Sequence, residues 1–125
     1  MRTFKVDDLE IIHIQIVDAS GGSQGTRDRG RLEAVVASQT QVVFGQELYP
    51  SLYEKAAALC RGIIADHPFV DGNKRTGIIS ALLFLERNGK QTNLTDRELE
   101  AFAVKVATDH LDVIVIAAWL KAHSE

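Results

Sequence analysis

The chain has 125 residues, 46% of them hydrophobic and 25% charged, with a net charge of −3. This length and composition predict a single domain, residues 1–125, and the negative charge excludes attraction of nucleic acid over the whole surface. Cys60 is the only cysteine, which excludes an intrachain disulfide and a cysteine-based zinc site. No apolar stretch is long enough for a bilayer and the start lacks a signal-peptide pattern, so we expect a cytoplasmic protein without a membrane partner.

The hydrophobic period is helical along most of the chain. A first helix is predicted to be capped by Asp7 or Asp8 and to end before Gly21. His13 lies within this helix and is predicted to be a surface or boundary residue. The apolar residues expected to share the inward face are Leu9, Ile12 and Ile16.

A glycine-rich, charged loop, residues 21–30, follows this helix. Asp28 can cap a second helix, and Arg27 and Arg29 either line a functional site or belong only to a charged loop. Residues 42–49 contain a central glycine and are followed by a proline. This composition predicts a short extended flap or hairpin rather than a helix.

The second half of the chain predicts four more helices. The third begins after Ser51 and is stopped by Pro68, and the fourth spans residues 73–88. Residues 95–98 have the spacing of a capping box that opens a fifth helix, and Asp112 can cap the last one. The fourth helix is apolar nearly all round, which is typical of a central helix. The expected fold class is therefore all-α, a compact bundle of about six helices with a possible short flap hairpin.

One segment, residues 67–77, concentrates chemically useful side chains and reads His-Pro-Phe-Val-Asp-Gly-Asn-Lys-Arg-Thr-Gly. It predicts a loop that enters the N-terminus of the buried fourth helix, where free N–H groups and the helix dipole favour an anion. Lys74 and Arg75 lie at this positive end and therefore favour a phosphate ligand. His67 can accept a proton near neutral pH. The segment predicts a phosphate-handling active site.

Each of these residues has a plainer interpretation when it is considered alone. His67 could only hydrogen-bond a turn, and Asp71 is about as well suited to capping a helix as to binding Mg²⁺. Gly72 allows a sharp turn and a close approach to a ligand. Asn73 could cap the helix or orient a phosphate oxygen. The combination, rather than any single residue, favours a functional site.

The segment resembles the signature of the Fic/Doc superfamily, and specifically that of the death-on-curing (Doc) toxins. The resemblance extends to residues 25–33, 49–56 and 82–89, and so covers nearly the whole chain. It implies a small bundle of about six helices. It also implies an enzyme that uses ATP and Mg²⁺ and transfers part of the nucleotide to a hydroxyl side chain of a target protein.

The resemblance also implies roles for individual residues. His67 matches the catalytic base, Asp71 the magnesium ligand, and the residues that match the nucleotide- and phosphate-binding loop are Gly72, Asn73, Lys74 and Arg75. Residues 42–48 correspond to a flap that docks the target as an extended strand. The chain lacks the S/T-x-x-x-E-G/N segment with which Fic proteins inhibit themselves. We therefore expect a cognate antitoxin whose disordered tail folds on the toxin, and no direct nucleic-acid partner.

Two positions separate the chain from Fic enzymes that transfer AMP, which resemble H-x-F-x-[D/E]-G-N-G-R-x-x-R. Lys74 replaces the second glycine of that pattern and Ile78 its last arginine. In the Doc branch this change accompanies transfer of the γ-phosphate to elongation factor Tu, so the expected function is that of a kinase toxin that arrests translation. Gly72 is Fic-like, since the best-known Doc toxin has alanine there, and AMP transfer is the first alternative. A catalytically inactive binding module is the second.

Overall fold

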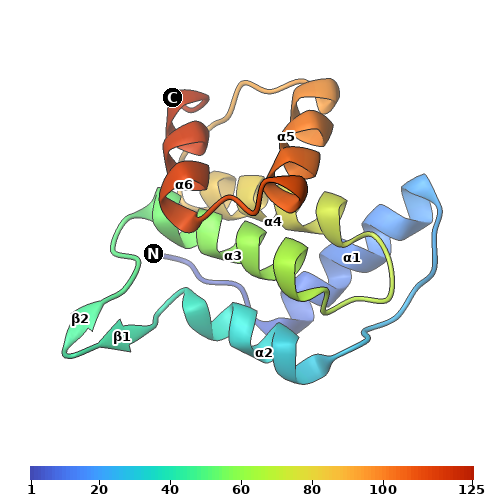
Figure 1. Ribbon diagram of the computed structural model, residues 1–125, viewed down its shortest axis with the longest axis horizontal. Helices are drawn as coiled ribbons and strands as arrows, with labels where there is room; N and C mark the ends of the chain where they lie inside the picture. Colours follow the sequence, from blue (N-terminus) through green and yellow to red (C-terminus); the bar gives the residue numbers. More distant parts are fainter.

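The computed structural model describes all 125 residues and contains six helices and one two-stranded hairpin (Figure 1). In chain order the elements are α1 (Val6–Ser20), α2 (Arg29–Ser38), β1 (Val42–Val43), β2 (Gln46–Glu47), α3 (Leu52–Asp66), α4 (Asn73–Arg87), α5 (Asp96–Thr108) and α6 (Val113–Ala122). The predicted all-α bundle with a flap hairpin is therefore confirmed. No helix has the length and apolar character needed to cross a membrane.

Most predicted helix starts are confirmed by their side-chain caps. The N-cap side chains that accept a hydrogen bond from the N–H three residues further on are those of Asp28, Ser51, Thr95 and Asp112. The predicted cap of α1 is wrong, because Lys5 occupies the N-cap position and Asp8 lies in the first turn. Asp8 Oδ2 accepts from the Lys5 N–H at 2.7 Å, so it satisfies the helix start from inside the helix.

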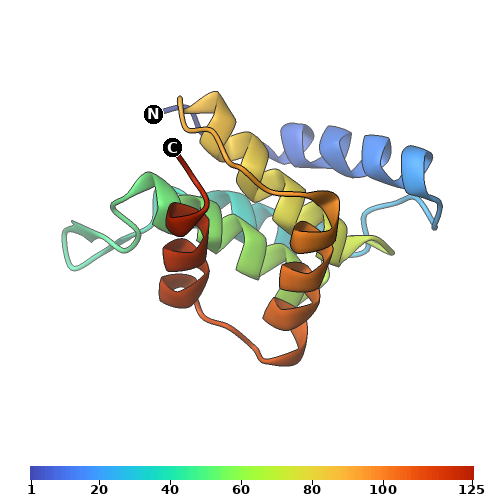
Figure 2. The ribbon, with the colours of Figure 1, turned by 90° about the horizontal axis from the view of Figure 1, so that it is seen from above.

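The hydrophobic core is centred on α3 and α4, which run antiparallel through the middle of the molecule (Figure 2). α3 packs against α2, α4, α5 and α6, and α4 packs against α1, α3 and α5. The prediction that α4 is a central helix is confirmed by these contacts, although Leu83 on its outer face is 37% exposed. Cys60 is fully buried in α3, and burial raises the pKa of its thiol to about 12.

A glycine allows α3 and α4 to approach closely. A Cβ atom added at Gly77 would lie 2.7 Å from Ile64 Cγ1 and 3.0 Å from the Cys60 carbonyl oxygen. Contacts this short require the two helix backbones to move apart, and overpacking a core in this way is destabilising.

We expect Gly77→Ala to lower the free energy of unfolding by about 2 kcal/mol, since the methyl group meets the buried Ile64 side chain and the Cys60 carbonyl oxygen, which cannot rotate away. Urea denaturation of the variant and the wild type measures this loss. Gly30→Ala is the matched control, because Gly30 is also helical but an added Cβ meets only Asp28 Oδ1, at 3.4 Å. The control should be neutral or slightly stabilised. Equal stability of the two variants would contradict the close-approach argument.

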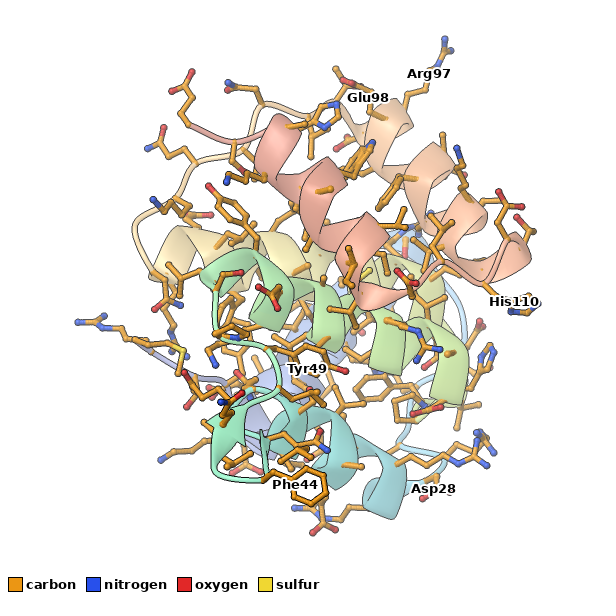
Figure 3. All side chains as sticks on the ribbon, turned by 60° about the vertical axis from the view of Figure 1, so that its left-hand side comes forward. Asp28, Phe44, Tyr49, Arg97, Glu98 and His110 are labelled. Carbon is orange, nitrogen blue, oxygen red and sulfur yellow. The ribbon has the colours of Figure 1, made fainter.

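The hairpin has the geometry of a tight two-residue turn. Val42 pairs with Glu47 and Val43 with Gln46, and the two turn residues, Phe44 and Gly45, have φ values of 51° and 78°. Positive φ at both positions is the signature of a type I′ hairpin. The Phe44 side chain is fully exposed at the tip (Figure 3).

The base of the hairpin, in contrast, is fixed to the core by a buried ammonium group. Lys55 is 3% exposed, and its Nζ donates to the Gln39 carbonyl oxygen at 2.8 Å and to Glu47 Oε1 at 2.9 Å. Gln39 is itself buried and hydrogen-bonds the main chain of Phe4 through both ends of its amide. This network connects β2 to the end of α2, to α3 and to the N-terminal segment.

Candidate active site

The predicted active-site loop, residues 67–72, connects α3 to α4 and lies against the loop that precedes α2 (Figure 1). The Arg27 N–H donates to the Pro68 carbonyl at 2.7 Å, and the Val70 N–H donates to the Gly25 carbonyl at 3.0 Å. These bonds form a short bridge between segments that are more than forty residues apart in the sequence. The main chain of the active-site loop is therefore held by tertiary structure.

Two arginines donate hydrogen bonds to the free carbonyl groups at the C-terminal end of α3, where the active-site loop begins. Arg27 Nε donates to the His67 carbonyl at 2.8 Å, and Arg31 Nη1 donates to the Asp66 carbonyl at 2.8 Å. Carbonyl groups at the end of a helix lack intrahelical partners and carry partial negative charge, so guanidinium groups stabilise them. The arginines fix the position from which His67 projects.

The structure assigns a place to each charged residue of the preceding loop. Arg27 belongs to the α3 cap, and Asp28 Oδ1 accepts from the Arg31 N–H at 3.1 Å as the N-cap of α2. Arg29 forms an exposed ion pair with Glu10 at 3.3 Å. None of these three residues lines the cavity that the active-site loop lines. They therefore contribute to the structure around the site and not to its surface.

His67 itself has an unusual backbone conformation and an exposed side chain. Its φ of 49° lies in the left-handed region, which costs energy for any residue except glycine and is least unfavourable for Asn, Asp and His. Its Nδ1 is 3.5 Å from Asn73 Nδ2, which is too long to fix the tautomer of the ring. The imidazole is thus exposed and makes no short hydrogen bond within the chain.

The Asp71 carboxylate is oriented by the main chain. Oδ1 accepts from the Gly72 N–H at 2.8 Å, and Oδ2 accepts from the Ser23 N–H at 3.2 Å. The hydrogen bonds from Ser23 and then Gly72 hold the pKa of this carboxyl below its usual range, so it is ionised at neutral pH. Gly22 is required here, since an added Cβ would lie 2.8 Å from Asp71 Oδ2.

The lowered pKa of Asp71 has a consequence for acid stability. The folded chain binds this proton less tightly than the unfolded chain does, so the carboxylate contributes stability above its unfolded pKa, and that contribution is lost as the pH falls through the folded pKa. We expect Asp71→Asn to reduce the loss of stability below about pH 4. Urea denaturation at several pH values measures this slope. Parallel pH curves for the variant and the wild type would contradict the assignment.

Asn73 is part of the site, but its side chain is committed to the loop. Asn73 Oδ1 accepts from the Phe69 N–H at 3.0 Å and Nδ2 donates to the Phe69 carbonyl at 2.9 Å. The amide is therefore engaged, and the main-chain N–H is the donor that Asn73 retains for a ligand. The N–H groups of Asn73, Lys74 and Arg75 form the first turn of α4 and have no acceptor within the chain.

All six residues predicted to form the site line one cavity of about 780 Å³: His67, Asp71, Gly72, Asn73, Lys74 and Arg75. Lys74 and Arg75 are exposed, and neither forms an ion pair. Apolar side chains of α1, α4 and α5 form an apolar wall of the same cavity, among them Ile16, Ile79, Leu99 and Val104. Two free cations beside unpaired helix N–H groups make this cavity suitable for a multiply charged anion.

One residue near the site was not found from the sequence. His13 was predicted at the surface or boundary of α1, yet it is 2% exposed, which corrects that prediction. Its ring stacks on Phe69, with ring centroids 4.0 Å apart, and its Nε2 is 2.7 Å from the Asp71 carbonyl oxygen. The helical period did place His13 next to the inward-facing Ile12. Only the tertiary structure shows that the active-site loop covers this side of α1.

The structure does not bring the hairpin to the cavity. No residue of the 42–48 segment lines it. In Figures 1 and 2 the hairpin lies at the N-terminal end of α3 and the active-site loop follows its C-terminal end. Because α3 has 15 residues, the two are separated by roughly 22 Å along the helix.

The bundle and its cavity define a class of protein in which a histidine, a carboxylate and two cations meet at a helix N-terminus. Residues 3–85 match the sequence model of the Fic/DOC family, and the chain belongs to this family. The predicted resemblance is thereby confirmed.

Two relatives extend the match over most of the chain. The chain is 41% identical over 104 residues to a protein named Toxin Doc from Mycolicibacterium smegmatis (strain ATCC 700084 / mc(2)155). This alignment covers 82% of this chain and 80% of that protein. The chain is 35% identical over 121 residues to a protein named Protein kinase doc from Escherichia phage P1. This alignment covers 97% of this chain and 94% of that protein. The alignments thus include the active-site loop together with the helices around it.

Proposed function

We propose that this chain is a Doc-type toxin that transfers the γ-phosphate of ATP to a hydroxyl side chain of a translation factor, elongation factor Tu, and so arrests translation. The observation that carries the proposal is the single cavity lined by His67, Asp71, Lys74 and Arg75, in which both cations lack a partner. The names of the two relatives, a toxin and a protein kinase, support the same function.

The residues present suit ATP and Mg²⁺. The first N–H groups of α4, together with Lys74 and Arg75, would hold the phosphates. Asp71 would hold Mg²⁺, because its carboxylate is exposed, ionised and oriented by two main-chain donors, and Mg²⁺ in such sites typically uses one or two carboxylates plus substrate phosphates. When bound, the metal ion would neutralise charge on the phosphates.

His67 would act on the target protein. Its imidazole would accept the proton of the attacking hydroxyl as the hydroxyl oxygen bonds to the γ-phosphorus and ADP leaves. Lys74 and Arg75 would neutralise the charge on the transferred group. In phosphoryl transfer, positioning and charge stabilisation contribute most of the rate enhancement. This suits an active-site loop whose main chain is hydrogen-bonded to Gly25 and Arg27 in the loop before α2.

The proposal is tested by incubating elongation factor Tu with this protein and Mg²⁺, with ATP labelled either at the γ- or at the α-phosphorus. We expect γ-label on the factor, a phosphate-sized gain in its intact mass and no α-label. Transfer of α-label with an AMP-sized gain would instead identify an AMP transferase, the alternative that Gly72 favours. Growth arrest that is unchanged in His67→Asn would identify an inactive binding module.

A cognate antitoxin is the expected partner, and its disordered tail would fold on the toxin. The apolar wall of the cavity, which includes Ile16, Ile79, Leu99 and Val104, offers a surface against which such a tail can order. A toxin that acts on a translation factor would work in the cytoplasm.

Docking of the target on the flap stays a prediction, and the structure constrains its form. The hairpin and the active-site loop lie at opposite ends of the 15-residue α3. An extended segment rises about 3.3 Å per residue. A target strand paired with the flap would therefore place the modified hydroxyl roughly seven residues away from the paired segment.

A further inference from the structure

His13 is a buried polar residue that none of the proposed chemical steps uses. It projects from α1 and is 2% exposed. Its Nε2 lies 2.7 Å from the Asp71 carbonyl oxygen. Because a carbonyl oxygen can only accept, His13 donates this hydrogen bond. The ring does not line the cavity, so any effect of His13 on a reaction must act through the loop.

The peptide unit that His13 binds is the turn into α4. Asp71 and Gly72 share it, and Gly72 has a φ of 74° as the N-cap residue. The carbonyl of this unit accepts from His13, and its N–H donates to Asp71 Oδ1 at 2.8 Å. The plane of the peptide is therefore held from both sides, and with it the direction of the Asp71 carboxylate.

The surroundings of the ring fix its position independently of the hydrogen bond. His13 and Phe69 stack with an interplanar angle of 4°, and the main chain of Phe69 is bound on both sides by the Asn73 amide. A Cβ at Gly72 would lie 3.4 Å from Val17 Cγ2, one turn further along α1. α1 thus packs directly beneath the turn.

We propose that His13 is a positioning residue for the transfer reaction. Its hydrogen bond to the Asp71 carbonyl sets the turn in which the Asp71 carboxylate and the first N–H groups of α4 face the cavity. This inference rests on the proposed function, and it adds a residue outside the motif that carries the chemistry. Side chains that orient a ligand-binding group in this way commonly change activity by 10- to about 100-fold when they are removed.

Two substitutions separate the hydrogen bond from the packing. His13→Leu fills the space of the imidazole with an apolar side chain and removes the hydrogen-bond donor to the Asp71 carbonyl. His13→Gln places an amide N–H close to the position of the imidazole Nε2. We expect His13→Leu to lower kcat about tenfold or more with little change in the KM for the target protein, and His13→Gln to restore most of the rate. Circular dichroism confirms that each variant is folded.

A second readout does not depend on activity. The ¹⁵N amide signals of Ser23 and Gly72 report the hydrogen bonds to the Asp71 carboxylate, so they should shift in His13→Leu and return towards wild type in His13→Gln. Unchanged kcat in folded His13→Leu, or an equal loss in both variants, would overturn the inference. If His13→Leu does not fold, the transfer rate of His13→Gln is the test, and a rate far below that of the wild type would overturn the inference. Absence of transfer by the wild type would overturn the proposed function, and the amide signals would still decide whether His13 sets the turn.

Discussion

Replacement of His67 by asparagine is expected to lower the rate of transfer at least 100-fold, because proton abstraction by a positioned base typically contributes about that factor or more. The free energy of unfolding should stay within about 1 kcal/mol of wild type, since the side chain is exposed and asparagine tolerates the left-handed backbone. Initial rates with labelled ATP and urea denaturation measure the two quantities.

His110→Asn is the matched control for this experiment. His110 is also exposed, has a φ of 51° and lies in the turn between α5 and α6 (Figure 3), outside the cavity. The same substitution therefore meets the same backbone conformation without touching the site. Wild-type rates in both variants would remove His67 from the mechanism, and a loss of stability only in His67→Asn would show that the imidazole supports the fold.

The second large effect is expected at Asp71. Asp71→Asn should reduce transfer at saturating ATP by about 100-fold and should raise the Mg²⁺ concentration required for half-maximal rate, since an amide is a weaker ligand than a carboxylate. The carboxylate side chain is exposed, so the core is unaffected. Rates measured as a function of Mg²⁺ concentration separate a metal-binding effect from a general loss of activity.

Asp66→Asn is the control for the charge change. Asp66 is exposed, its carboxylate forms no ion pair or hydrogen bond, and it lies outside the cavity, five residues before Asp71. This variant should keep the wild-type rate and Mg²⁺ dependence. An Asp71→Asn variant with the Mg²⁺ dependence of wild type would show that the carboxylate serves only to orient the loop.

Local signals were sufficient to predict the helices. Thr95 and Asp112 each cap a helix by a hydrogen bond to the N–H three residues further on. Residues within a few positions of each other therefore determine where these helices begin. α1 was the exception at its start, because Asp8 suits both the N-cap and the third helical position. The sequence contains no signal that distinguishes the two arrangements.

The site was predictable only where the residues are contiguous. His67 and Arg75 belong to one motif, and a helix start brings its N–H groups to the same place. His13 and Arg27 reach the loop from distant segments. Their contacts depend on how α1 and the 22–28 loop pack against residues 67–72, which no local period or spacing encodes.

The hairpin combines a base fixed to the core with a tip that the fold leaves unconstrained. Its base is locked by Lys55 and Glu47, whereas the tip, residues 42–45, contributes no buried side chain. A substitution at Phe44 therefore has little effect on core packing, and it lies a full helix away from the residues that line the cavity. The residues at the tip can thus be replaced without disturbing the arrangement of the cavity.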